Sequence, residues 1–368
     1  MNRCAKCLMP DTRPDTPFID GVCSACVTHE NRKEIDWAAK ERELVEMLEK
    51  MPRNGTGYDC IVPSSGGKDS TWQVVKLKEL GVRPLVVTAE TCHLTRIGAE
   101  NIDNLARLAS TLRYVPNKSV RARLNLIGLT TVGDISWPEH VSIFTTPFKA
   151  AVQTGIPLIF YGECPQAIWG GPLGTEENKR MTRRWVSEYG GFLGMRPEDM
   201  IGQCGITEED MRDYMPPSDE DIEVLGVEAF FLGQFCDWDS HRNAEVAIAH
   251  GMKYELPCHT NYWEWENLDN AQTGIHDHLA LVKYGYSRGT VQLSADIRLG
   301  LISREDALPI AEFCEDNFPY FYGGISHQDI LAKIDMTPEE YLHLADQFTN
   351  WDMFRRVDDC HTHKLMRV

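Results

Sequence analysis

Residues 59–71 constrain the fold more than any other stretch, because an apolar strand, a glycine turn and a helix start follow one another there. Gly66 and Gly67 allow the backbone to turn sharply and to approach a ligand closely. Lys68 adds a positive charge, and the helix expected over residues 70–80 directs the positive end of its dipole at the turn. Hydroxyls beside the turn come from Ser64, Ser65 and Ser70. The stretch therefore predicts a site for an anion such as a nucleotide phosphate.

The common phosphate loop, Gly-x-x-x-x-Gly-Lys-Ser/Thr, is absent, since the glycines here are adjacent and Asp69 separates Lys68 from Ser70. The order Ser-Gly-Gly-Lys-Asp-Ser after an apolar strand instead resembles the pyrophosphate loop of ATP pyrophosphatases. Those enzymes adenylate a carbonyl oxygen and release pyrophosphate. The resemblance implies that residues 64–70 bind ATP. The alternative is a turn that merely joins a strand to a helix, but such turns rarely combine all six residues.

Charge and hydropathy limit the partners of the chain. Its 368 residues include 37 Lys and Arg against 55 Asp and Glu, for a net charge of -18. This charge repels phosphate backbones unless cations cluster on one face, so nucleic acid is a disfavoured partner. The sequence contains no run of about 18 apolar residues that could cross a bilayer, and nothing at the N-terminus resembles a signal peptide. We therefore expect a cytoplasmic protein without a membrane partner.

Two Cys-x-x-Cys pairs near the N-terminus predict a metal site. Cys4 and Cys7 form one pair, Cys23 and Cys26 form the other, and fifteen residues separate the pairs. This is the spacing of a tetrahedral zinc knuckle. Residues 9–17 cannot build a core of their own, so Zn²⁺ is expected to hold residues 1–34 together. Redox-active thiols are the alternative, which the paired spacing disfavours.

Strand and helix patterns alternate after a charged linker helix expected in residues 35–57. Strands are expected at residues 59–63, 83–88, 113–115, 157–161 and 229–232, with helices between them. Strands joined by helical crossovers run parallel. The sequence thus predicts an α/β fold with a parallel, doubly wound sheet over residues 58–255. Residues 256–368 are predicted to be a mainly helical C-terminal region that contacts substrate or a partner.

Gly162 and Glu163 directly follow the apolar run at residues 157–161. In doubly wound folds, ligands bind in the crevice at the carboxyl ends of the strands. Gly162 is therefore predicted to contact the nucleotide, and Glu163 is a candidate catalytic residue. A solvated surface glutamate is the alternative.

Residues 165–217 are rich in glycine and charge, and we expect a long irregular insertion that acts as a lid, a binding loop or an interface. Its basic cluster at residues 179–184 is a candidate phosphate contact, although a solvated helix face is the more usual outcome.

His276 and His278 should point to different helix faces and not share a metal. At the C-terminus, a frayed end is favoured over a metal site at residues 360–363.

The C-terminal region holds two candidate substrate sites. Trp265, Glu266 and Asn267 combine aromatic and polar groups, which could line a sugar or base pocket, although aromatic residues also simply pack. Asp296 and Arg298 precede a turn and are expected to form an ion pair or to contact an anion.

Together, these stretches resemble the N-acetyl sugar amidotransferases of bacterial surface-glycan biosynthesis. The resemblance extends over nearly the whole chain and is carried by the paired cysteines and by residues 9–12, 58–70, 155–163, 188–191, 265–269, 274–277 and 294–298. Cys164 departs from it, because asparagine is expected after Gly162 and Glu163. The fold implied is the HUP, or adenine nucleotide alpha hydrolase-like, sheet.

This resemblance implies that ATP activates the oxygen of an N-acetyl group on a nucleotide-linked sugar and that ammonia displaces AMP, leaving an acetamidino group. Lys68 would stabilise charge on the leaving pyrophosphate, and Asp69 would position Mg²⁺. A separate glutaminase subunit would supply ammonia, since no local motif here combines a nucleophilic cysteine with histidine. A tRNA thiolase and a nucleotide-binding regulatory module are the alternative functions.

Overall fold

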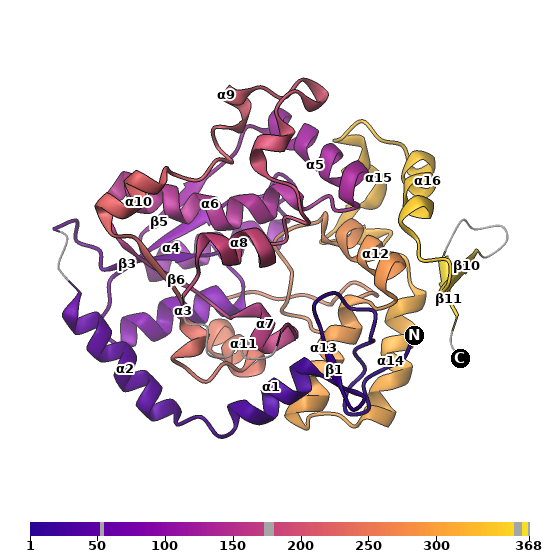
Figure 1. Ribbon diagram of the computed structural model, residues 1–368, viewed down its shortest axis with the longest axis horizontal. Helices are drawn as coiled ribbons and strands as arrows, with labels where there is room; N and C mark the ends of the chain where they lie inside the picture. The colour runs from indigo at the N-terminus through magenta and orange to yellow at the C-terminus, as the bar shows by residue number, and fades with distance from the viewer. Residues whose placement is uncertain (52–54, 173–179, 357–362, 367–368) are drawn as a thin grey trace.

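The computed structural model describes residues 1–51, 55–172, 180–356 and 363–366 (Figure 1). At its centre lies a five-stranded sheet with the order β5-β4-β3-β6-β7, in which every neighbouring pair is parallel. The strands are β3 (Cys60–Pro63), β4 (Pro84–Ala89), β5 (Thr111–Tyr114), β6 (Leu158–Tyr161) and β7 (Glu228–Phe231). The order reverses at β3, the first strand of the sheet along the chain. The predicted parallel, doubly wound α/β fold is confirmed.

Helices cover both faces of this sheet because successive strand residues point to opposite sides. Cys60 and Val62 pack with α3 (Lys68–Glu79), α4 (Arg96–Leu108), α11 (Ser240–Ala249) and Leu44 of α2 (Trp37–Lys50). Ile61 lies on the other face, with α6 (Trp137–Thr154) and α8 (Arg183–Tyr189). The helix expected as a linker, α2, thus contributes to the core through Leu44. A further helix, α5 (Lys118–Val132), packs against α6.

The residues predicted to form an irregular insertion contain several short helices. These are α7 (Pro165–Trp169), α8, η2 (Pro197–Met200), η3 (Gln203–Gly205) and α9 (Glu208–Met211). They precede α10 (Asp219–Leu225). Buried Met200, Met211 and Tyr214 pack against α5 and α6, which explains the order of this segment. The described part of the segment is therefore less irregular than expected, since short helices alternate in it with turns and loops.

The basic cluster of this segment lies on the surface. Arg180, Arg183 and Arg184 form ion pairs with Glu228, Asp219 and Glu188, respectively, while Lys179 lies outside the described residues. Exposed pairs of this kind are typical of a solvated face and contribute little to stability.

The C-terminal region is helical, with α12 (Thr273–Tyr284), α13 (Arg288–Leu299), α14 (Arg304–Asp316), α15 (His327–Ala332) and α16 (Pro338–Phe348). It also contains two small hairpins, β8 (Phe321–Tyr322) with β9 (Ile325–Ser326) and β10 (Phe354–Arg356) with β11 (His363–Leu365). Its apolar core includes Leu129 and Ile135 from the α/β part of the chain. The N-terminal segment packs against two of the C-terminal helices, α13 and α14.

The N-terminal segment folds as the hairpin β1 (Phe18–Ile19) and β2 (Val22–Cys23) followed by α1 (Ser24–Arg32). Leu8 is fully buried against Leu293 of α13 and Ala307 of α14. In Figure 1 this indigo segment lies beside the orange helices α13 and α14, although the two are far apart in sequence. Among the described residues, no helix has the length and apolar character needed to cross a bilayer.

Candidate active site

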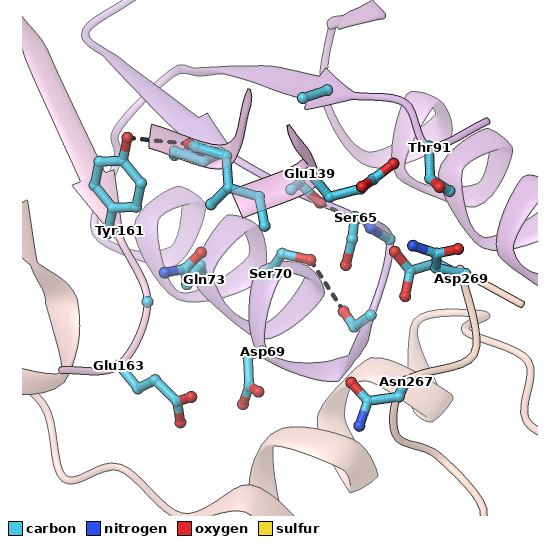
Figure 2. A pocket seen from close by; sticks show the side chains of 18 of the residues that line it. Ser65, Asp69, Ser70, Gln73, Thr91, Glu139, Tyr161, Glu163, Asn267 and Asp269 are labelled. Carbon is cyan, nitrogen blue, oxygen red and sulfur yellow. Dashed lines mark hydrogen bonds between the residues drawn. The ribbon is translucent and has the colours of Figure 1, made fainter. Parts of the chain in front are cut away.

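A cavity of about 410 Å³ opens at the carboxyl ends of the parallel strands, where the strand order reverses. Ligands of doubly wound folds bind at this position. The structure brings most of the predicted site residues into its lining: Ser64, Ser65, Gly66, Gly67, Lys68, Asp69, Ser70, Gly162, Glu163, Trp265, Glu266 and Asn267. Figure 2 shows the carboxylates of Asp69 and Glu163 directed into the same space, with Asn267 across from them. The cavity is thus lined by both the sheet and the C-terminal region.

The glycine turn owes its shape to Gly66. This residue has a φ of +85°, and a Cβ atom there would lie 2.8 Å from the backbone nitrogen of Ile102. The amide of Gly66 donates a hydrogen bond to Ser64 Oγ (3.1 Å). Gly67 is extended and forms the N-cap of α3, so the helix begins two residues earlier than expected. Lys68 therefore lies in its first turn, where free amides and the dipole favour an anion.

Lys68 is a buried cation at the floor of this cavity, with only 4% of its surface exposed. Its Nζ lies 2.6 Å from Asp69 Oδ2 and 3.5 Å from Glu266 Oε1, and 5.3 Å from the centre of the Trp265 ring. Burial alone would lower the pKa of Lys68, but the surrounding carboxylates, Asp69 first, raise it above its ordinary value. The ammonium group is therefore charged near neutral pH.

Glu163 follows β6 and has one satisfied and one unsatisfied carboxyl oxygen. Oε1 accepts a hydrogen bond from Trp169 Nε1 (2.6 Å), whereas Oε2 is buried without a partner among the described residues. Burial, and then the charge of Asp69, raise the pKa of Glu163 to about 8, although Lys68 opposes the shift. A carboxyl group with this pKa can exchange a proton near neutral pH, as a general acid or base must.

Asp69 lies between Lys68 and α11. Its Oδ1 accepts a hydrogen bond from Asn243 Nδ2 (2.9 Å), and its Oδ2 is the atom paired with Lys68. Mg²⁺ is commonly held by one or two carboxylates together with substrate phosphates. The Asp69 carboxylate, at the wall of the cavity, fits that donor set. Asn243 was missed because nothing in the local sequence of α11 connects it to the glycine turn.

Two of the candidate substrate residues lie elsewhere. Asp296 accepts from Trp263 Nε1 and lies 2.7 Å from His241 Nε2, while Arg298 contacts Cys7 Sγ and the carbonyl of Ile168. Both belong to α13, and neither is part of the cavity lining. The expected ion pair between them is replaced by these separate contacts, because residues two apart on a helix point to different faces.

The four paired cysteines meet in one buried cluster. Cys4 Sγ lies 3.9 Å from Cys26 Sγ, and Cys7 Sγ lies 3.6 Å from Cys23 Sγ. A tetrahedron with Zn–S bonds of about 2.3 Å has edges of about 3.8 Å. Three backbone amides, those of Lys6, Cys7 and Cys23, also point at Cys4 Sγ. The cluster could therefore bind a metal such as Zn²⁺.

A second cavity, of about 490 Å³, adjoins the first and shares Glu163, Pro165, Glu266 and Asn267 with it. Its other walls carry several charged or titratable side chains that the sequence analysis assigned to no site: Arg13, His140, His276, Asp277 and Arg288. Arg13, His140 and Arg288 come from segments far apart in the sequence, so no local motif shows that they share a cavity.

His140 and His276 also meet Asp134 in a cluster with metal-ligand chemistry. The distance from His276 Nδ1 to Asp134 Oδ1 is 2.7 Å, whereas two ligand atoms on one zinc ion lie about 3.3 Å apart. The shorter distance is that of a hydrogen bond. Burial would lower the pKa of His276, but Asp134 raises it above its ordinary value. His278 bonds instead to Tyr341, as expected for residues on different faces.

Comparison with known proteins bears on the wall formed by residues 265–270. Residues 257–367 match the family model described as LPS biosynthesis protein WbpG-like, C-terminal domain. This similarity supports a role in glycan biosynthesis. The match includes the stretch that carries Trp265, Glu266 and Asn267, and it covers less than half of the chain. A search of curated proteins finds no match.

Proposed function

We propose that the chain is an ATP-dependent amidotransferase that converts the N-acetyl group of a nucleotide-linked sugar to an acetamidino group in surface-glycan biosynthesis. The observation that carries the proposal is the shared cavity. Lys68 and the first turn of α3 lie on one side of it, and residues 265–270 of the glycan-biosynthesis-like region lie on the other. The amides at the start of α3 and a wall from the glycan-biosynthesis-like region thus face the same space.

The proposed reaction has two steps. The acetamido oxygen attacks the α-phosphorus of ATP and pyrophosphate leaves; ammonia then adds to the activated carbon and AMP departs with that oxygen. Lys68 and the amides at the start of α3 suit the charge that develops on pyrophosphate. Glu163, with its raised pKa, suits the removal of a proton from the attacking nitrogen. Mg²⁺ held by Asp69 would neutralise phosphate charge.

Ammonia is proposed to come from a separate glutaminase. Most ammonia is protonated near neutral pH, so a channelled supply should outperform bulk ammonium. High ammonium at raised pH should nevertheless replace the partner.

The test incubates the full-length protein with ATP, Mg²⁺ and a panel of nucleotide-linked N-acetyl sugars, with either ammonium chloride or glutamine. Pyrophosphate, AMP and the mass of the sugar product are measured. Ammonium should yield a product in which NH replaces oxygen, and glutamine alone should not. Lys68→Ala should lower turnover by about a hundredfold or more, with a smaller loss of nucleotide affinity. Lys33→Ala, which removes an exposed lysine, is the matched control.

Three outcomes would contradict this proposal. Full activity with glutamine alone would remove the need for a partner. Modification of tRNA instead of a sugar would favour the thiolase alternative. ATP binding without pyrophosphate release under any acceptor would favour a regulatory module.

A further inference from the structure

The second cavity carries an arginine whose charge is not neutralised. The Arg13 guanidinium contacts the backbone carbonyl of Trp169, and no carboxylate of the described residues lies within ion-pairing distance of it. Burial lowers the pKa of Arg13, and Tyr286 and Cys23 offset only part of this effect. In a chain with a net charge of -18, a partly buried cation without a counter-ion is unusual. An anionic ligand would supply that counter-ion.

Arg288 adds a second guanidinium to the same cavity. Its NH2 and Nε groups bind Asp277 at 2.7 and 3.2 Å, which fixes the orientation of the side chain. Tyr286 and Ser287 also line the cavity beside it. Guanidinium groups suit phosphate oxygens because they carry several N–H donors in one plane, and Asp277 engages only the Nε and NH2 groups of Arg288. The walls therefore offer phosphate chemistry from two separate segments.

Arg13 reaches the cavity from the N-terminal segment that carries the cysteine cluster. Arg13 lies between the two cysteine pairs, and the neighbouring Thr12 Oγ1 donates a hydrogen bond to the carbonyl of Tyr284 at the end of α12 (2.5 Å). The N-terminal segment thereby reaches from its own buried cluster to the wall of the cavity. The cysteine cluster and Arg13 thus belong to one segment, and the contacts of that segment with Tyr284 and Trp169 place Arg13 at the wall of the cavity.

We propose that the second cavity binds a nucleoside-diphosphate N-acetyl sugar, with its diphosphate at Arg13 and Arg288 and its acetamido group toward Glu163 and Glu266. The inference rests on the proposed function and names the site of its sugar substrate. Glu163 and Glu266 line both cavities, so a ligand held by its diphosphate at the two arginines can present its other end to the ATP cavity. The two substrates would then bind together and not compete.

The test uses calorimetry on the full-length, metal-loaded protein with UDP-N-acetylglucosamine, UDP and free N-acetylglucosamine. Binding is repeated with saturating α,β-methylene-ATP. Arg13→Ala should weaken binding of UDP-N-acetylglucosamine and UDP by about tenfold or more, with binding of the ATP analogue unchanged. Arg13→Lys should retain part of the affinity, because a point charge still attracts phosphate. Arg183→Ala, which removes an exposed arginine elsewhere, should bind like the wild type.

Metal content and thermal midpoint establish whether each variant is folded. If Arg13→Ala does not fold, Arg13→Gln keeps a donor for the Trp169 carbonyl and removes only the charge. Unchanged affinity in the folded variant, displacement of the sugar nucleotide by the ATP analogue, or no binding of any diphosphate would overturn the inference. Binding of the sugar nucleotide without binding of the ATP analogue would instead count against the proposed function and leave this site standing.

Discussion

Glu163 shows how one residue's surroundings set its chemistry. Its carboxyl group lies in a buried position near the carboxylate of Asp69, and both features disfavour its ionised form. The sequence predicted that Glu163 lies at the cavity, because strand order alone places the end of β6 there. It did not predict the raised pKa. That shift depends on burial and on the charges of Asp69 and Glu266, and these surroundings exist only in the complete tertiary structure.

This shift predicts a pH-dependent stability. Folding raises the pKa of Glu163 from 4.5 to about 8, so the folded chain retains a proton that the unfolded chain has lost. Raising the pH from 4.5 to about 8 therefore favours unfolding at this group. Glu163→Gln cannot ionise, so its free energy of unfolding should decrease less over this range than that of the wild type. Chemical denaturation at pH 5 and pH 8 measures the difference.

Glu79→Gln is the control for the loss of a carboxylate, because Glu79 is exposed at the end of α3. It should follow the wild-type pH dependence. Equal pH dependence in Glu163→Gln and the wild type would show that Glu163 is ionised in the folded chain at pH 5 already.

Single elements differ in how far their sequence determines them. The strand, turn and helix at residues 59–79 were recognised because each has a local signal: the apolar run, the two adjacent glycines and the start of the helix, respectively. The helix α13 was not recognised: residues 294–298 do precede a turn at Gly300, as expected, but the helix that contains them was not predicted. Its sequence includes glycine, threonine, valine and serine, which are poor helix formers. Packing of Leu293 and Ala295, together with the Ser287 cap, outweighs that local preference.

The glycine turn permits a test with an internal control, because its two glycines have different conformations. Gly66 has a positive φ and no room for a Cβ atom beside Ile102, whereas Gly67 has a φ of −75° and only Ser65 Oγ nearby at 3.5 Å. Gly66→Ala should therefore destabilise the chain by about 1–3 kcal/mol and displace the turn. Gly67→Ala should change the free energy of unfolding by less.

Chemical denaturation measures the free energy of unfolding, and the affinity for α,β-methylene-ATP tests whether the turn keeps the shape needed for binding. Equal effects of the two substitutions on the free energy of unfolding would contradict the strained geometry assigned to Gly66. A stable Gly66→Ala variant that binds the analogue normally would contradict the proposed role of the turn.

At the scale of the whole molecule, the N-terminal segment connects parts that the sequence treats as separate. Its cluster of four cysteines was predicted from spacing alone, but the segment was expected to lack a core. Leu8 and Met9 are in fact buried, Arg3 pairs with Glu315 of α14, and Arg304 donates to the carbonyls of Cys4 and Cys7. Such long-range contacts leave no trace in the spacing of the cysteines. The proposed metal would thus stabilise a part of the structure in which the N-terminal segment packs against the C-terminal helices α13 and α14.

Metal removal should therefore act beyond the N-terminus. Cys23→Ser removes one of four thiolates, so the chain should lose about one zinc ion, and the segment should become sensitive to protease. Because Leu8 packs between α13 and α14, the thermal midpoint of the whole chain should fall as well. Cys204→Ser, at an exposed cysteine, should keep its metal, its midpoint and its protease resistance. Full metal loading after all four cysteines are replaced by serine would refute the site. Metal loss without a change in midpoint would show that packing on α13 and α14 holds the segment independently of the metal.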